Sequence, residues 1–393
     1  MRILFATHTP LDASGSGIYL RKVAEHLLSE GHEALVLCLA GSAVDTFAFR
    51  QETIGTPGRP SRWNLPFDFP NFSGHRDSHL LYDDVDEAGI ATYLDVWTSA
   101  LTDLAQEFKP DVLVVNHAFL IACAAASIPT LPYVVVSHGS EFLRPRKNAA
   151  FDTYRRHGMQ AAREVVAVAP AIAALMAEAG DIDLERIHIV SPGYDPDVFQ
   201  PAPVDRAAVL EPFGLSAARP CVAYVGRIVA YKRVPDMLAG LAAIPAERRP
   251  QALVIGDGPA LSDAMDAAKR LGMQEAVFGG HIADRHRLAE VFNAIDLLVL
   301  PSEFDPYPMT AIEALACGTP VLTSDQCGVT DIVADVAGAV YPGGDTQAIG
   351  ERVQEALRDG WKASRGPEGP ARVAAKAWPA IADQLLDILK QAA

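Results

Sequence analysis

The sequence predicts an α/β protein built from two doubly wound parallel sheets that face a central cleft. Strand-like and helix-like segments alternate along almost all of the 393 residues. The strand-like segments are continuous runs of Val, Leu and Ile, which is typical of parallel strands covered by helices on both faces. The pattern then restarts after residues 190–205, a segment rich in Pro and Asp that we interpret as a linker.

The first half begins with a strand at 2–7 and a helix at 17–31, whose apolar residues recur at helical spacing up to Gly31. Further strands are expected at 33–40, 111–116, 132–139 and 165–169. Residues 52–90 contain a turn-rich, aromatic stretch that fits neither pattern. We expect a loop over the cleft there, because long loops in compact domains are usually functional or disordered.

The second half repeats the alternation. Strands are expected at 221–227, 251–258, 276–280, 296–302, 320–324 and 338–342, with helices between them. Residues 371–392 have the pattern of an amphipathic helix, kinked at Pro379. Ligands of such sheets bind at the carboxyl ends of the strands, so functional residues are sought there.

Composition restricts the class of protein. Half of the residues are apolar, and 49 acidic against 33 basic residues give a net charge of −16. Such a chain is a poor general binder of nucleic acid or of anionic membranes. The five cysteines show no CxxC spacing, which favours reduced core thiols. No run of 18 apolar residues occurs, and the first residues resemble a strand rather than a signal peptide, so we expect a cytoplasmic protein.

Two features of the first half could contact a ligand. Gly15 and Gly17 directly precede a helix, where backbone N–H groups and the helix dipole favour an anion. The same pattern also begins ordinary helices, and it does not match the dinucleotide motif GxGxxG with a following acid. His138, in "SHGSEF", lies at the carboxyl end of a strand, although a lone histidine is more often structural.

Two features of the second half carry more chemistry. In "YVGRIVAYKRV", Arg227 ends a strand and Lys232 opens the next helix, so the two cations could grip a diphosphate; the alternative is a solvated basic turn. In "FDPYPMTAIEALACGTPV", Asp305 lies just ahead of a helix that starts near Pro308, and Glu313 lies in the second turn of that helix. The helix start can hold phosphate, and the two acids can accept hydrogen bonds from sugar hydroxyls.

An acid followed after seven residues by the Glu of "EALACGTPV" resembles the signature of the retaining, GT-B-fold glycosyltransferases of family 4 (glycosyl transferases group 1), in the glycogen-synthase-like superfamily. The resemblance extends along nearly the whole chain, through "GSGIYLRKVAEHLLSEGHE", "VSPGYDPDVFQP", "GRIVAYKRV" and "IGDGP". It implies two Rossmann-like domains: an acceptor-binding domain at 1–195 and a nucleotide-sugar-binding domain at 196–375. A last helix at 376–393, with Trp378, would return to the first domain.

The resemblance also implies roles. Arg227 and Lys232 would bind the donor diphosphate and stabilise the leaving nucleotide, Glu313 would hold the ribose, and Asp305 would meet the transferred sugar. His138 would contact that sugar from the first domain. Further donor contacts would come from Gly15, Gly17, Gly256, His281, Ile282, Tyr307, Met309 and Thr310, with the backbone around His281 and Ile282 facing the base.

The chain departs from the family where Glu-Gly-aromatic-Gly is usual and Asp305–Pro306–Tyr307–Pro308 stands instead. The prolines lack N–H donors, while Tyr307, Met309 and Thr310 keep theirs. We therefore expect that phosphate binding is retained and that sugar recognition is altered.

The expected function is transfer of a hexose from a nucleotide-diphosphate sugar, UDP first and GDP second, to an unidentified acceptor hydroxyl. No metal or other cofactor is expected, because the acid pairs at 84–86 and 195–197 lie far from the donor motifs in the sequence. Two alternatives stay open: a sugar phosphorylase on the same fold, and a degenerate sugar-nucleotide binder. No motif specifies an oligomeric state.

Residues 144–163 hold six Arg or Lys and one acid. We expect Arg144, Arg146 and Lys147 to lie near the acceptor opening, where they could face an anionic acceptor or make a weak peripheral contact with a membrane. The alternative interpretation is a solvated helix.

Overall fold

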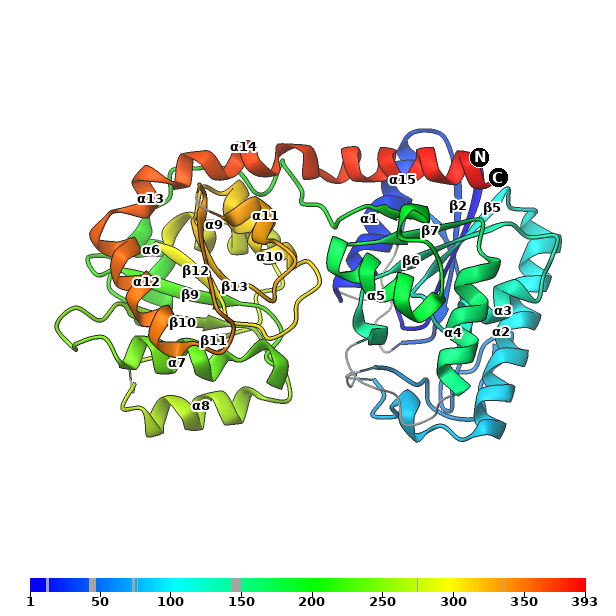
Figure 1. The fold of residues 1–393 in the computed structure, drawn as a ribbon, viewed down its shortest axis with the longest axis horizontal. Helices are drawn as coiled ribbons and strands as arrows, with labels where there is room; N and C mark the ends of the chain where they lie inside the picture. Colours follow the sequence, from blue (N-terminus) through cyan, green and yellow to red (C-terminus); the bar gives the residue numbers. More distant parts are fainter. Residues whose placement is uncertain are drawn as a thin grey trace. The chain divides into compact units, whose positions relative to one another are not determined.

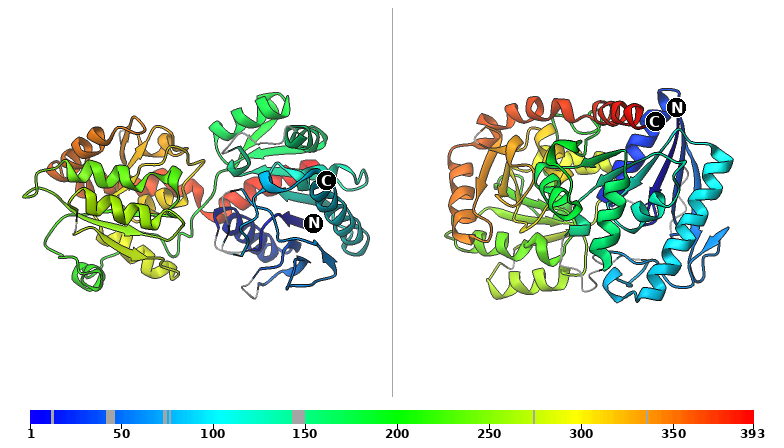
Figure 2. Two further views of the ribbon diagram at one scale, coloured as in Figure 1. Left: turned by 90° about the horizontal axis from the view of Figure 1, so that it is seen from below. Right: turned by 45° about the vertical axis from the view of Figure 1, so that its right-hand side comes forward.

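The computed structural model describes residues 1–11, 14–41, 47–72, 75, 77–142, 150–273, 275–334 and 336–393. The chain forms two compact units, Met1–Pro192 with Trp378–Ala393, and Gly193–Ala377. Each unit is a parallel sheet with helices on both faces (Figures 1 and 2). The domain boundaries predicted at 195 and 375 lie close to these divisions.

The first unit contains an eight-stranded sheet in the order β4-β3-β2-β1-β5-β6-β7-β8. Every pairing in it is parallel. The strand order reverses between β1 and β5, which is where doubly wound sheets open a crevice at the carboxyl ends of their strands. The strands are β1 Arg2–Thr7, β2 Glu33–Leu39, β3 Arg50–Gly55, β4 Trp63–Asn64, β5 Val112–Asn116, β6 Tyr133–Ser137, β7 Glu164–Ala167 and β8 Ile187–Ile189.

The expected loop at 52–90 is only partly a loop. Its beginning belongs to β3 and β4, which extend the sheet on one side. The β3 sequence, RQETIG, is polar and half-exposed along most of its length, so it lacks the apolar run that marks the buried strands. The later part of this segment packs aromatic rings at the carboxyl end of β1, where Phe72 lies 4.8 Å from the ring of His8.

The helices of the first unit include α15, which comes from the far end of the chain. They are α1 Gly15–Ser29, α2 Glu87–Phe108, α3 Leu120–Ala126, α4 Ala150–Ala161, α5 Pro170–Gly180 and α15 Trp378–Ala392. The helix α15 packs against α1, with the rings of Trp378 and Tyr19 5.8 Å apart. The predicted kink is instead a break between α14 and α15, because Pro379 occupies the first turn of α15, where its missing N–H costs nothing.

The second unit contains a six-stranded sheet in the order β11-β10-β9-β12-β13-β14. All six strands predicted for this half form: β9 Cys221–Val225, β10 Gln251–Ile255, β11 Val277–Gly280, β12 Leu297–Leu300, β13 Val321–Ser324 and β14 Gly338–Tyr341. The strand order reverses between β9 and β12. The strands β9, β10, β12 and β13 are buried along their whole length, as continuous apolar runs predict.

The helices of the second unit are α6 Arg206–Leu210, α7 Val234–Ala242, α8 Leu261–Arg270, α9 Arg285–Ala294, α10 Met309–Ala316, α11 Thr330–Val333, α12 Thr346–Arg358, α13 Trp361–Ser364 and α14 Gly369–Val373. The segments that begin and end this unit lie side by side, since the N–H of Tyr194 donates to the carbonyl of Lys376 at 3.0 Å. From Gly193 onward, the segment predicted as a linker therefore belongs to the second unit, where it pairs with the end of that unit.

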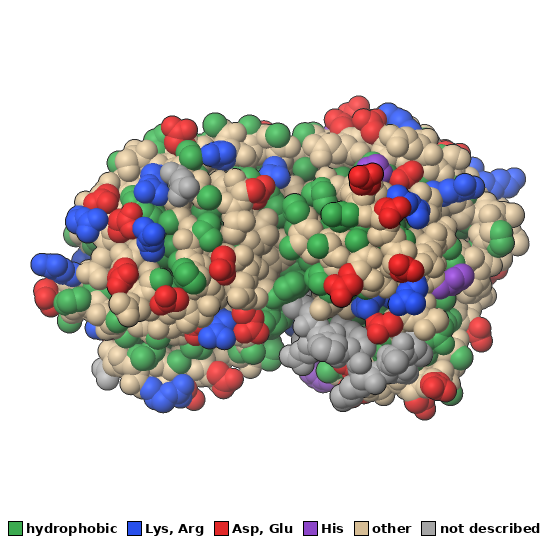
Figure 3. Space-filling view, in the orientation of Figure 1, with side chains coloured by type: hydrophobic (Ala, Val, Ile, Leu, Met, Phe, Trp, Pro, Cys, Tyr) green, Lys and Arg blue, Asp and Glu red, His purple; other side chains and the backbone are tan. Residues whose placement is uncertain are grey.

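Charge and thiol placement agree with the composition. Acidic and basic side chains are interspersed over the face of the second unit seen in Figure 3. All five cysteines are free thiols, and all but Cys123 are buried, which confirms the predicted reduced core thiols. Among the helices that the structure describes, none is long and apolar enough to cross a membrane.

Candidate active site

Three glycines shape the carboxyl edge of the second sheet. Gly226, after β9, and Gly256 and Gly258, after β10, have φ angles of 157°, 141° and 155°. A Cβ on Gly256 would lie 1.8 Å from the carbonyl oxygen of Gly226, and one on Gly258 would lie 2.2 Å from that of Ile228. Only glycine permits this contact between the two loops. The contact holds the exposed Arg227 at the end of β9.

Lys232 and Asp305 form a buried ion pair beside these loops. Lys232 ends a short 3-10 helix, Ala230–Lys232, and its Nζ donates to Oδ2 of Asp305. The two side chains are only 16% and 11% exposed. Burial alone would lower the pKa of Lys232, but the charge and hydrogen bond of Asp305, together with Tyr231 and Cys327, outweigh burial, and the pKa is raised. Lys232 is therefore a cation at neutral pH despite its burial.

The turn around Asp305 is tied to the neighbouring loop. The backbone of Asp305 forms a parallel β-bridge with that of Cys327, and the carbonyl of Asp305 accepts the N–H of Gly328 at 2.8 Å. Pro308 then caps α10, which starts at Met309, so the helix start predicted near Pro308 is confirmed. The first turn of a helix leaves its N–H groups without intrahelical acceptors, and here these belong to Met309 and Thr310.

Tyr307 sits inside this turn. Its side chain is buried, and the ammonium of Lys376 lies 5.0 Å from the centre of its ring. Tyr307 therefore occupies the aromatic position of the family signature, between Pro306 and Pro308 in the sequence, and its side chain packs inside the second unit.

Glu313 lies on the second turn of α10 and is only 1% exposed. Its Oε1 accepts from Nη2 of Arg285, the first residue of α9. Its Oε2 is buried and has no hydrogen-bond partner in the described part of the chain. Burial raises the pKa of Glu313, and Arg285 opposes this effect. A buried carboxylate oxygen without a partner calls for a donor from a ligand.

Arg285 is a residue that the sequence reasoning missed. Its guanidinium lies 4.7 Å from the centre of the Phe199 ring, which orients it toward Glu313. The only signal was its place shortly after His281 and Ile282. Those two follow β11, where His281 is exposed and Ile282 half-buried.

The structure therefore gathers most predicted donor residues at one edge of one sheet. Arg227 and Lys232 follow β9, Gly256 follows β10, His281 and Ile282 follow β11, and Asp305 follows β12. The carboxyl ends of parallel strands share an edge, so these residues belong to one region of the second unit.

Three more predicted residues, Gly15, Gly17 and His138, lie at the carboxyl edge of the sheet in the first unit. Ser14 caps α1, and its Oγ accepts the N–H of Gly17 at 3.2 Å. A side chain on Gly15 would meet no atom within 4 Å, so the backbone is open there. His138 follows β6, and its Nε2 lies 2.6 Å from Oδ1 of Asn116, the last residue of β5.

Two further histidines, His8 after β1 and His117 after β5, join His138 and were missed. Ring centres are 4.1 Å apart between His8 and His117, and 5.0 Å between His117 and His138. Burial, and then the charge of His117, hold the pKa of His138 well below its ordinary value. The signal for His117 was available, because "NHAF" places polar residues directly after a buried strand.

Glu141 stabilises the carboxyl edge of the first sheet through hydrogen bonds to the turns after β5 and β6. It is fully buried, and its Oε1 accepts from Oγ of Ser137 at 2.7 Å and from the N–H of Ala118 at 3.0 Å. His117 has a φ of 103°, which is strained for a side chain with a Cβ. The bond from Ala118 to Glu141 holds the chain in this turn. Burial lowers the pKa of His117, and Glu141 partly opposes this.

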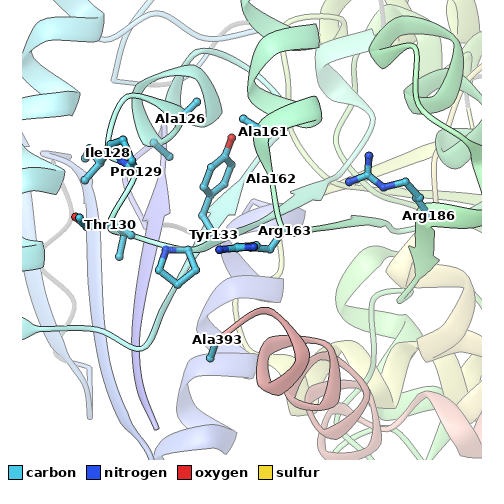
Figure 4. Close-up of a pocket in the computed structure, with 13 residues that line it drawn as sticks. Ala126, Ile128, Pro129, Thr130, Tyr133, Ala161, Ala162, Arg163, Arg186 and Ala393 are labelled. Carbon is cyan, nitrogen blue, oxygen red and sulfur yellow. The ribbon is translucent and has the colours of Figure 1, made fainter.

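A cavity of about 580 Å³ lies at the other edge of the first sheet. Figure 4 shows Tyr133, Arg163 and Arg186 around it, at the amino ends of β6, β7 and β8. None of the predicted site residues that the structure describes lines it. Arg144, Arg146 and Lys147 lie outside the described residues. Within the described ranges, no group of three or more His, Cys, Asp or Glu is placed to hold a metal ion.

Two family models match this chain, one over each half. The Glycosyl transferase 4-like domain matches residues 14–193, and Glycosyl transferases group 1 matches residues 206–369. The chain belongs to the family 4 glycosyltransferases. The matched ranges contain the signature residues Asp305 and Glu313 and most of the strands of both sheets.

Several curated proteins are similar in sequence. A D-inositol 3-phosphate glycosyltransferase of Xylanimonas cellulosilytica is 32% identical over 245 residues, covering 58% of this chain and 58% of that protein. A D-inositol 3-phosphate glycosyltransferase of Mycobacteroides abscessus is 38% identical over 213 residues, covering 52% of this chain and 46% of that protein. The matches thus span about half the length of these relatives. An alpha-maltose-1-phosphate synthase of Mycolicibacterium smegmatis is 28% identical, covering 75% and 82%.

Solved structures share the fold over the whole chain. Sucrose-phosphate synthase from Thermosynechococcus elongatus has a TM-score of 0.80 at 21% identity, covering 100% of this chain and 98% of that one. HepE from Anabaena, in complex with UDP-glucose, has a TM-score of 0.76 at 19% identity, covering 99% of each. The fold of this family 4 member is GT-B, as the sequence predicts.

Proposed function

We propose that this family 4 protein is a retaining glycosyltransferase that moves a hexose from a nucleotide-diphosphate sugar to an acceptor hydroxyl. The observation that carries the proposal is the buried Oε2 of Glu313, which lacks a partner in the described chain and lies in the same sheet edge region as the Lys232–Asp305 pair. UDP is the first candidate and GDP the second. HepE, a structural neighbour, was solved in complex with UDP-glucose, which supports UDP.

In this proposal, Lys232 and Arg227 bind the diphosphate, together with the N–H groups at the start of α10. Lys232 is suited to this, since its raised pKa keeps it charged. The Oε2 of Glu313 accepts a hydrogen bond from a ribose hydroxyl, and Arg285 holds the carboxylate in place through Oε1. The backbone at His281 and Ile282 faces the base.

The chemistry needs no nucleophile from the protein. The bond between the sugar C1 and the phosphate oxygen breaks, and the acceptor oxygen bonds to C1 on the same face of the sugar. The proton of the acceptor hydroxyl passes to the leaving diphosphate. Catalysis then consists of orientation and of electrostatic stabilisation by Arg227, Lys232 and the helix N–H groups, without a metal. Asp305 and, from the first unit, His138 contact the sugar.

A degenerate sugar-nucleotide binder is a second candidate, and one observation favours it. The carboxylate of Asp305 is already engaged by Lys232, and Pro306 and Pro308 provide no N–H donors. Such a protein would bind a nucleotide sugar without turning it over.

A donor screen tests these functions. The protein is incubated with UDP-, GDP-, ADP- and dTDP-sugars in EDTA, and nucleotide release and thermal stabilisation are followed. We expect the sugars of one nucleotide to release nucleotide or to stabilise the protein. The effect should be smaller in Glu313→Ala and unchanged in Lys269→Ala, since Lys269 is an exposed lysine on α8. Binding without release, whether water or an added hydroxyl compound is the acceptor, would indicate the degenerate binder, and phosphate-dependent release of sugar phosphate would indicate a phosphorylase. The absence of any response would overturn the proposal.

A further inference from the structure

Asn116 links the imidazole of His138 to the glycine loop at the start of α1. It is the last residue of β5, and its side chain is almost fully buried. Its Nδ2 donates to the carbonyl oxygen of Ser16 at 3.3 Å. Its Oδ1 lies 2.6 Å from Nε2 of His138. One amide thus bridges the start of α1 and the turn after β6, which lie far apart in the sequence.

These two contacts determine which nitrogen of His138 carries a proton. The carbonyl of Ser16 can only accept a hydrogen bond, so it must face the amide nitrogen of Asn116. The amide oxygen then faces His138. That oxygen can also only accept, so the proton must be on Nε2 of His138.

The surroundings of His138 favour a neutral ring. The ring of His117 packs against that of His138, and His8 packs against His117 in turn. The ring of Tyr19, on α1, is nearly perpendicular to that of His138, with the ring centres 5.1 Å apart. The nearby carboxylate of Glu141 bonds to Ser137 and Ala118 instead. No acid among the described residues forms a hydrogen bond or an ion pair with the imidazole. A neutral ring with its proton on Nε2 has a lone pair on Nδ1.

We propose that Asn116 is a positioning residue that holds His138 as the neutral Nε2–H tautomer, so that Nδ1 accepts a hydrogen bond from a hydroxyl of the transferred sugar. No described residue hydrogen-bonds to Nδ1. The sugar contact depends on the proposed function, whereas the tautomer does not. The bridge to Ser16 also means that the imidazole and the glycine loop share one support.

The tautomer is measured directly by NMR of the full chain with ¹⁵N-labelled histidines. The signals of His138 are identified by their loss in His138→Gln. We expect a protonated, pyrrole-type Nε2 and an unprotonated, pyridine-type Nδ1, unchanged between pH 6 and 8. A proton on Nδ1, or an imidazolium at pH 7, would overturn the proposal. This measurement needs no donor, no turnover and no Asn116 variant that folds.

Variants of Asn116 test the cause. In Asn116→Asp a carboxylate faces Nε2, so His138 should titrate at least one pH unit higher than in the wild type. In Asn116→Leu the acceptor is lost, and both tautomers should be populated. The control is Asn293→Asp, an amide that bonds to carbonyls in the second unit, which should leave the His138 signals unchanged. An unchanged titration in Asn116→Asp would refute the role of the amide.

A binding arm connects the tautomer to the donor. The dissociation constant of UDP-glucose is measured from pH 6 to 9. Below the pH at which His138 titrates in Asn116→Asp, we expect this variant to bind UDP-glucose at least tenfold more weakly than it does above that pH. The wild type should show no such change in affinity over this pH range. Equal pH profiles would refute the sugar contact. Lack of UDP-glucose binding by every protein would count against the proposed donor, while the NMR result would still decide the tautomer.

Discussion

Replacing Asp305 by Asn should expose the energetic cost of a buried lysine. The Lys232–Asp305 pair has side chains only 16% and 11% exposed. Asn keeps the shape and removes the charge, so the ammonium of Lys232 stays buried without a counter-ion. Breaking one side of a buried pair costs about 3–5 kcal/mol. Since both groups keep some solvent contact, we expect a loss of about 3 kcal/mol in the free energy of unfolding of the second unit.

Hydrogen exchange measures this loss locally. Peptides from β9 and β12 are followed as a function of urea, which reports the opening of the second unit. The matched control is Asp266→Asn, whose partner Lys269 and own carboxylate are 71% and 58% exposed. That exposed pair should be worth less than about 0.5 kcal/mol. The double variant Lys232→Met with Asp305→Leu should regain most of the loss, because both charges are removed.

The variant Asp305→Asn also tests whether Lys232 binds the diphosphate of the donor. With Asp305 neutral, a bound diphosphate would supply the counter-ion that Lys232 has lost. UDP should therefore stabilise Asp305→Asn more than the wild type in a thermal-shift assay. If Asp305→Asn cost no more stability than Asp266→Asn, the interpretation of a buried, mutually dependent pair would be wrong.

Three further substitutions test the glycine contact, the ribose acceptor and a buried lysine. Gly256→Ala should cost roughly 3 kcal/mol or more in chemical denaturation, because its Cβ would lie 1.8 Å from a carbonyl oxygen at a φ of 141°; Gly15→Ala, with open space around it, should change stability little, and equal costs would contradict the steric argument. Glu313→Gln should weaken UDP binding roughly 10–100-fold in calorimetry, since a hydrogen bond to a charged group contributes about 1.5–3 kcal/mol; unchanged affinity would remove Glu313 from the ribose. Burial lowers the pKa of Lys362 to about 8, so its charge costs stability fully below that pH and less as pH rises toward the unfolded value. The stability of Lys362→Met relative to the wild type should therefore fall by roughly 2 kcal/mol between pH 7 and 10, and a constant difference in urea melts would contradict the shift.

The sequence predicted the buried strands and the donor motifs because both are local signals. Continuous apolar runs specify β9, β10, β12 and β13, which are fully buried. The strands β3 and β4 were missed because they are an edge extension with a polar or very short sequence. Their pairing depends on the sheet already formed, not on their own residues.

By itself, then, the sequence determined the two-sheet architecture, the family signature and the turns after β9 and β12 that carry Arg227, Lys232 and Asp305. Only the tertiary structure decided which side chains meet. Lys232 and Asp305 are 73 residues apart, Arg285 and Glu313 are 28 apart, and Asn116 bonds to a carbonyl 100 residues away. Such pairs have no spacing pattern, because parallel strands bring distant turns to one edge through the order of the sheet. The charge of Lys232 and the tautomer of His138 are consequences of that order.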